Sequence, residues 1–224
     1  MTVPFSPMPA RAFFRWAALA ALFFIPFGAK KFLYAFWGRP AELSSAFFYL
    51  TDALVALALA GFLMFPGKGK ADEHKAEKAL FGAFLFFSAY SLLAAGNLPL
   101  GAYSLFRLMF AMLFGMMLAF ALREKAVPLR DVYIALSASA GVQAVIGALQ
   151  FLRGRGTGLR LLGEPVFDGG VARVAVGGVE YLRAYGTMAH ANILAAFLGI
   201  GALALFRWWM ARASRAGMKE KVFF

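Results

Sequence analysis

The sequence contains no cysteine, only two histidines, and 11 acidic residues against 23 lysines and arginines. The absence of cysteine excludes a disulfide framework and a thiolate metal site. Two histidines are too few for a histidine-based metal cage, so we expect neither a metal nor another cofactor. The formal net charge of +12 would suit nucleic acid only if the basic residues were gathered on one water-facing module. They lie instead in short clusters between apolar runs, a pattern typical of topology signals in membrane proteins.

Apolar residues dominate the composition. Hydrophobic residues make up 62% of the chain and the mean hydropathy is +0.72, whereas soluble domains contain roughly 45–50% apolar residues. A membrane-spanning helix needs about 20 mostly apolar residues. We therefore predict an all-α integral membrane protein, a single domain over residues 1–224, with about six spans at 12–29, 46–65, 79–95, 102–122, 132–152 and 192–210.

The first apolar stretch has a second interpretation. Arg11 and Arg15 precede WAALAALFFIPFGA, and a short basic segment before an apolar run also fits a secretory signal peptide. The following residues, KKFLYAFW, stand where a signal peptide would have a small-residue cleavage site and a polar mature start. A membrane span is therefore favoured.

The distribution of lysine and arginine predicts the orientation. With a cytoplasmic N-terminus, the inside segments hold fourteen of these residues and the outside segments eight, five of them in the long connection 153–191. Because long loops cross the membrane largely regardless of charge, the short loops decide the orientation. The prediction is a multi-pass protein with its N-terminus in the cytoplasm and loop 153–191 outside.

The long loop is expected to have structure of its own. Two β-favouring runs, VARVAV and VEYLRAYG, are joined by Gly177-Gly178, which predicts a β-hairpin. A flexible connector is the alternative interpretation. At the end of the chain, MKEKVFF is similar to a cytoplasmic loop followed by the start of another span. We therefore expect further spans to follow this sequence.

Polar residues interrupt the predicted spans. Asp52 and Arg107 have opposite charges and similar depths, and an ionised residue within the bilayer normally has a partner or faces a cavity. Pairing and an outward-facing cavity are both consistent with these positions. Gln143 and Gln150 lie seven residues apart and share a helix face, which favours interhelical hydrogen bonds.

The stretch RAYGTMAHANILAAFL resembles a segment of the O-antigen ligase and polymerase family. In that family an arginine is followed by Gly-Thr, by His-Pro-Asn and by a membrane helix, and here the positions read Arg183, Gly186-Thr187 and His190-Ala191-Asn192. Ala191 replaces the proline. The resemblance extends more weakly over residues 45–206, including LLGEP and FFYLTDALVALAL.

The resemblance implies a metal-independent glycosyltransferase in the bacterial cytoplasmic membrane. Such enzymes take a glycan from a polyprenyl-pyrophosphate carrier on the outer face and pass it to a lipid or glycan acceptor. This chain would form the N-terminal half. The alternatives are a transporter or lipid-handling protein, in which Asp52 and Arg107 line a translocation path, and a non-catalytic membrane subunit.

A pyrophosphate ligand calls for fixed positive charge, and arginine supplies a planar donor fork that stays protonated. Arg183 is the first candidate for pyrophosphate binding and Arg107 the second, with Asp52 as an orienting partner. Asn192 is expected to cap the last helix, whose N-terminus favours anions. The candidate substrate-binding residues are thus Arg183, Arg107, Asp52, Asn192 and Gln150, and His190 is the candidate base for the acceptor hydroxyl.

Overall fold

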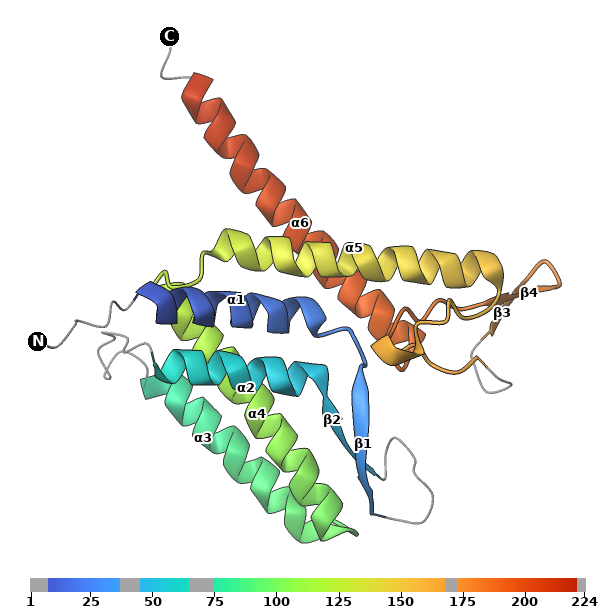
Figure 1. Cartoon of the computed structure of the whole chain (residues 1–224), viewed down its shortest axis with the longest axis horizontal. Helices are drawn as coiled ribbons and strands as arrows, with labels where there is room; N and C mark the ends of the chain where they lie inside the picture. The colour runs from blue at the N-terminus through green and yellow to red at the C-terminus, as the bar shows by residue number, and fades with distance from the viewer. Residues whose placement is uncertain (1–7, 37–44, 65–74, 168–172, 221–224) are drawn as a thin grey trace, which may run out of the picture.

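The computed structural model of the chain describes residues 8–36, 45–64, 75–167 and 173–220. These residues are mostly helical, with two small antiparallel sheets (Figure 1). The elements are α1 (Met8–Phe24), β1 (Lys30–Ala35), β2 (Ser45–Tyr49), α2 (Leu50–Leu63), α3 (Lys75–Tyr90), η2 (Ser91–Ala94), α4 (Leu98–Arg123), α5 (Leu129–Arg153), η3 (Arg160–Leu162), β3 (Arg173–Val176), β4 (Val179–Leu182) and α6 (Ala191–Glu220).

Three helices are long and apolar enough to cross a membrane, which indicates a membrane protein. They are α4, α5 and the Ala191–Ala213 part of α6, and they match three predicted spans to within a few residues. The other three helices stand where spans were predicted, but α1, α2 and α3 have only 17, 14 and 16 residues. The six-span prediction is therefore not confirmed by the helix lengths of the described residues.

Two of the predicted spans are shorter because the chain changes conformation between them. Pro26 disfavours helix at the residue before it, and α1 ends at Phe24 in a turn closed by the Phe27 amide. Residues 46–49, predicted as helix, instead belong to β2, which pairs with β1. Tyr103 of α4 holds this strand, because its hydroxyl donates to the carbonyl of Phe47 and accepts from its amide.

Small residues set the close packing of the helices. Helix α1 packs on α2 and α5, and α5 packs on α6. Ala18 and Ala21 of α1 and Ala58 of α2 are completely buried, together with Phe14. A Cβ atom on Gly61 would lie 2.9 Å from the Phe13 ring, so α1 and α2 approach as closely as a glycine allows.

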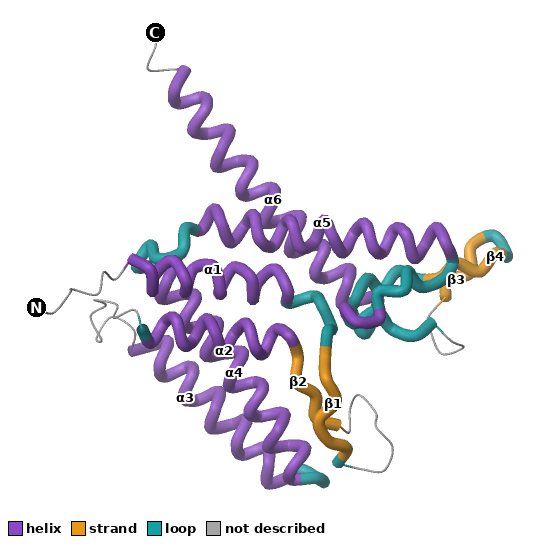
Figure 2. The backbone as a smooth tube through the Cα atoms, in the orientation of Figure 1, coloured by secondary structure: helices purple, strands orange, loops and turns teal. Residues whose placement is uncertain are grey.

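Successive helices run in opposite directions, which gives the molecule two ends (Figure 1). The start of α1, the end of α2 and the α4–α5 connection lie at one end, here called the turn end. Both hairpins and the long segment between α5 and α6 lie at the other, the loop end (Figure 2). The C-terminal half of α6 diverges from the bundle.

The hairpin predicted in the long loop is confirmed. Strands β3 and β4 pair with Val176 opposite Val179. Gly177 and Gly178 connect them with φ angles of 59° and 82°. Positive φ at both central residues is the geometry of the two-residue turn that matches strand twist, and glycine adopts it without strain.

Candidate functional site

The long loop is fixed to α5 by the two glutamines. Both are completely buried. The Gln143 amide donates to Thr187 Oγ1 at 2.7 Å, and its oxygen accepts from the Thr187 amide at 3.0 Å. The prediction of interhelical hydrogen bonds is therefore wrong, because these glutamines bind the loop that precedes α6 rather than another helix.

Gln150 uses its whole amide in the same way. Its nitrogen donates to Glu164 Oε1 and to the Gly186 carbonyl, and its oxygen accepts from the amides of Tyr185 and Gly186, all at 2.8–3.0 Å. An amide side chain offers two donors and two acceptor lone pairs, and all four are occupied. Gln150, predicted to contact substrate, thus holds the loop in place and has no hydrogen-bonding capacity left for a ligand.

Glu164 organises the first part of the loop. Its carboxylate accepts from the Thr157 hydroxyl, from the amides of Thr157 and Leu159, and from Gln150. Burial raises the pKa of the Glu164 carboxyl, but the hydrogen bonds from these donors outweigh burial and lower the pKa below its ordinary value. The carboxylate is therefore committed to the loop as an anion.

The loop also lies directly against the turn after α1. Thr187 Oγ1 donates to the carbonyl of Pro26 at 3.0 Å, and the Gly28 amide donates to the carbonyl of Thr187 at 3.3 Å. Gly163 has a φ of 95°, and a Cβ atom there would lie 2.3 Å from the Gly28 Cα. The backbones meet at a distance that only glycine permits.

A half-open cavity of about 700 Å³ lies beside these contacts at the loop end. Three cationic side chains line it from separate elements: Lys30 of β1, Arg107 of α4 and Arg160 of η3. Glu164 also lines it, but its carboxylate is bonded within the loop. The remaining lining residues are largely apolar and include Ile25, Phe27, Val166, Met188, Ile193 and Phe197. The cavity therefore combines excess positive charge with an apolar wall.

The structure brings Asp52 and Arg107 together. Arg107 Nη2 lies 3.6 Å from Asp52 Oδ1, and its guanidinium lies 4.1 Å from the centre of the Tyr49 ring. The other Asp52 oxygen accepts from the Tyr49 amide at 2.9 Å, at the start of α2. The predicted pair is thus present, and Arg107 lines the cavity as well, so the pairing and cavity interpretations are compatible.

The residues taken from the family resemblance lie elsewhere. Arg183 is exposed, and its Nη2 donates to Asn192 Oδ1 at 2.6 Å. Asn192 lies inside the first turn of α6, so the expectation that it caps the helix is wrong. His190 is exposed just before that helix. None of the three belongs to the residues that line the cavity, although Ala189 does, and their binding and catalytic roles stay predictions.

Sequence reasoning missed Lys30 and Arg160. Lys30 enters the cavity because Pro26 ends α1 early and turns the chain into β1. Arg160 is placed by the contact between Gly163 and Gly28, which are far apart in sequence. The glycine in RLLGEP was a local signal for a turn, but its partner could be found only in three dimensions.

Comparisons with protein families, with curated proteins and with solved structures gave no match to this chain. The resemblance to O-antigen ligases therefore stays a prediction from the motif residues, chiefly those of 183–198.

Proposed function

We propose that the loop-end cavity binds the diphosphate of a polyprenyl-pyrophosphate-linked glycan, and that the chain is part of an O-antigen ligase-like transferase. In this proposal all six helices cross the bacterial cytoplasmic membrane, the N-terminus is cytoplasmic and the loop end faces outward. One observation carries the proposal: Lys30, Arg107 and Arg160 line one cavity from three separate elements.

The chemistry of the cavity suits this ligand at both of its ends. A diphosphate carries several negative charges, and an arginine fork with a lysine point charge can bind its oxygens. The same charges would stabilise the negative charge that develops on the leaving phosphate during glycan transfer. The apolar wall offers a place for the first isoprene units of the carrier.

The assignment of roles follows the geometry. Arg107 takes precedence over Arg183, because Arg183 lies outside the cavity and is bonded to Asn192. Asp52 holds Arg107 in place together with the Tyr49 ring. His190 follows the cavity-lining Ala189 and is the candidate base for the acceptor hydroxyl.

Ligand binding to the full chain in nanodiscs tests the cavity. The probes are undecaprenyl diphosphate and undecaprenyl monophosphate, and the variants are Arg107→Gln and Lys30→Gln. Lys30→Gln leaves Asp52 with its partner. We expect either variant to weaken diphosphate binding about tenfold or more, since a hydrogen bond to a charged group contributes about 1.5–3 kcal/mol.

The matched control is Arg153→Gln, an exposed arginine at the end of α5 that does not line the cavity. Equal affinity for the two lipids, or equal weakening by the control, would remove the cavity from the proposal. Transfer is assayed separately, in membranes that contain the protein. Diphosphate binding without any glycan transfer would favour the lipid-handling alternative.

A further inference from the structure

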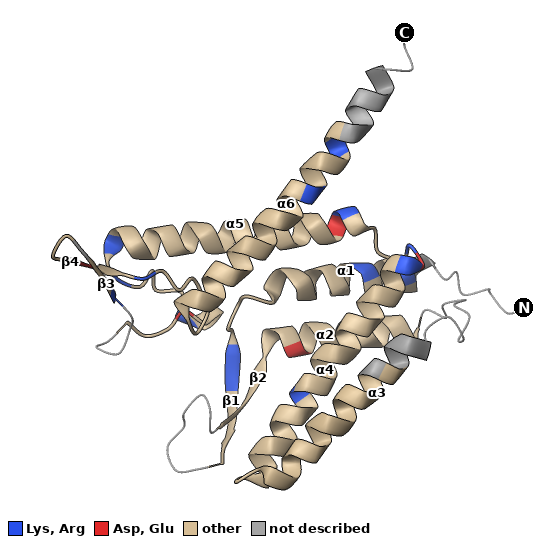
Figure 3. Ribbon diagram, turned by 180° about the vertical axis from the view of Figure 1, so that it is seen from behind, with Lys and Arg blue, Asp and Glu red and all other residues tan. Residues whose placement is uncertain are grey.

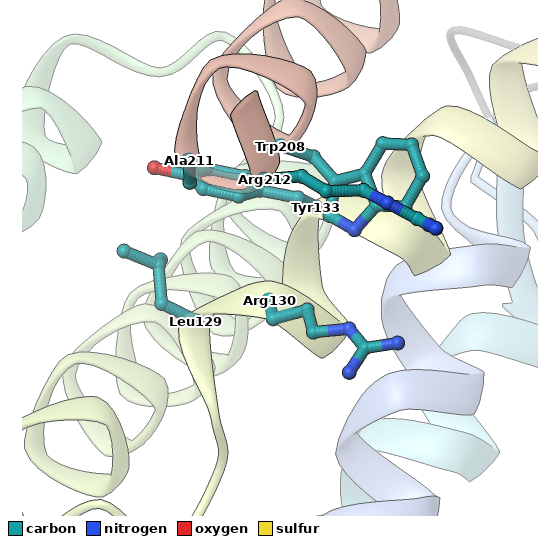
Figure 4. Close-up of a pocket in the computed structure, with 6 residues that line it drawn as sticks. All are labelled: Leu129, Arg130, Tyr133, Trp208, Ala211 and Arg212. Carbon is teal, nitrogen blue, oxygen red and sulfur yellow. The ribbon is translucent and has the colours of Figure 1, made fainter. Parts of the chain in front are cut away.

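A second pocket lies between α5 and α6 at the turn end. Its volume is about 410 Å³. The first turns of α5 contribute Leu129, Arg130 and Tyr133, and the later part of α6 contributes Trp208, Ala211 and Arg212. The pocket occupies the region where α6 diverges from the bundle (Figures 1 and 4). It shares no lining residue with the loop-end cavity.

The charge of this second pocket is positive. Arg130 and Arg212 line it, and none of the acidic residues that the structure describes does. The neighbouring carboxylate, Asp131, forms an ion pair with Arg15 of α1. In Figure 4 the guanidinium groups of Arg130 and Arg212 extend toward the same side of the pocket. Two arginine forks on one side can bind the oxygens of a single phosphate.

Aromatic side chains complete the pocket. The Arg212 guanidinium lies 5.7 Å from the centre of the Trp208 ring, within the range of a cation–π contact. The Tyr133 hydroxyl points away from the guanidinium groups, so this side chain presents its ring to the pocket (Figure 4). Tryptophan, tyrosine and arginine near helix ends are typical of the level at which lipid headgroups lie.

Apolar side chains near the pocket are exposed on both helices. They are Leu205 and Trp209 on α6 and Leu129 and Ile134 on α5, all with at least 41% of their surface exposed. In a membrane this surface faces acyl chains. A phosphate held between the two arginines is therefore positioned with apolar chains beneath it, which is the architecture of a phospholipid.

We propose that the pocket between Arg130 and Arg212 binds the phosphate headgroup of an anionic phospholipid, with its acyl chains against α5 and α6. Basic pockets between transmembrane helices are a recognised mode of anionic-lipid binding. The bound lipid fills the gap between the diverging helices and fixes the angle between α5 and α6. This site is independent of the diphosphate cavity at the other end of the molecule.

Native mass spectrometry of the full chain tests the site with phosphatidylglycerol and phosphatidylcholine as probes. The pocket variant is Arg130→Gln combined with Arg212→Gln. The matched control, Lys125→Gln combined with Arg207→Gln, removes the same charge from exposed residues that do not line the pocket. We expect the pocket variant to reduce the preference for phosphatidylglycerol about thirtyfold, because each of the two cations contributes about 1 kcal/mol near a lipid surface.

Retention of the preference for phosphatidylglycerol in the pocket variant would overturn the proposal. An equal loss in the control would also overturn it, because that result indicates only a general surface potential. Competition by millimolar inorganic phosphate as strong as that by the lipid would identify a free-phosphate site and overturn the lipid assignment. If the double variant fails to insert, Arg212→Gln alone decides, and it is expected to lower the preference at least threefold.

Discussion

Glu164 makes the stability of the long loop depend on pH. Its folded-state pKa lies below the ordinary value of 4.5, because the hydrogen bonds from Thr157, Gln150 and Leu159 outweigh the effect of burial. The carboxylate therefore contributes stability above about pH 4.5, and this contribution is lost as the pH falls through the folded pKa. We expect the melting temperature in detergent to fall in that acidic range, and the Glu164→Gln variant to show a smaller dependence.

At neutral pH, Glu164→Gln should lower the free energy of unfolding by about 1–3 kcal/mol, because one amide oxygen cannot serve all the donors that the carboxylate satisfies. Glu180→Gln is the control. That side chain is 67% exposed, and its ion pair with Arg173 is long, at 3.7 Å. Identical pH profiles for wild type and Glu164→Gln would show that this carboxylate does not set the acid sensitivity.

Substitutions of Gly163 and Gly158 distinguish the free-energy cost of a strained backbone from that of a steric clash. Both have φ angles above 90°, but a Cβ atom at Gly163 would collide with the Gly28 backbone, whereas Gly158 has open space around it. Gly158→Ala should cost about 1–2 kcal/mol for the strained backbone alone. Gly163→Ala should cost about 2 kcal/mol more, since the loop must move away from Gly28. Thermal unfolding measures both, and equal losses would contradict the close approach.

Single residues show how far sequence reasoning could reach toward the site. The pairing of Asp52 with Arg107 could be predicted, since two charges of opposite sign at similar depth in predicted spans need partners. Arg160 and Lys30 could not be predicted, because both carry the ordinary signature of a loop or strand cation and meet only after the chain folds. The arginine favoured by motif similarity, Arg183, lies outside the cavity that these residues form.

At the scale of elements, periodicity and turn chemistry succeeded where the signal was unambiguous. The Gly177-Gly178 hairpin and helices α4, α5 and α6 lie where the sequence predicts them. The prediction of helix for most of the run SAFFY was wrong, because a short apolar segment fits a strand and a helix equally well by pattern. Its pairing with β1 and its contact with Tyr103 decide for the strand, and neither is visible in local sequence.

The attachment of the long loop to α5 can be tested as a unit. Gln150→Leu introduces an apolar side chain of similar size and removes the four hydrogen bonds to Glu164, Tyr185 and Gly186. We expect the amides of residues 185–187 to exchange with deuterium about tenfold faster or more, since local opening becomes cheaper by at least ~1.4 kcal/mol.

The control for this experiment is Ser137→Ala, which removes a contact of 3.3 Å between α5 and the Gly201 carbonyl of α6 without touching the loop. Its exchange at residues 185–187 should match the wild type. Unchanged exchange in Gln150→Leu would show that the Thr187 and Gly28 contacts alone hold the loop.

At the scale of the whole molecule, cationic residues collect at the turn end and along the long loop at the loop end (Figure 3). Arg11 and Arg15 of α1 contact the α4–α5 connection and the start of α5, through the carbonyl of Lys125 and the carboxylate of Asp131. In membrane proteins, short basic connections set the orientation, whereas long loops cross the membrane largely regardless of their charge. The basic residues that gather at the turn end therefore predict that this end is cytoplasmic.

The absence of cysteine makes this orientation directly testable, because single cysteines can be added without removing any. Glu180→Cys lies on the exposed hairpin at the loop end, and Glu124→Cys is exposed at the turn end. Gly96→Cys lies in open space in the turn between η2 and α4. A membrane-impermeant maleimide should label Glu180→Cys and Gly96→Cys in intact cells, and Glu124→Cys only after lysis.

Labelling of Gly96→Cys only after lysis would show that the α3–α4 turn is not outside, which contradicts the six-span arrangement. Reversed labelling of Glu124→Cys and Glu180→Cys would place the loop-end cavity on the cytosolic side, where the proposed outward-facing glycan transfer is impossible, yet it would leave the positive charge of the cavity unchanged.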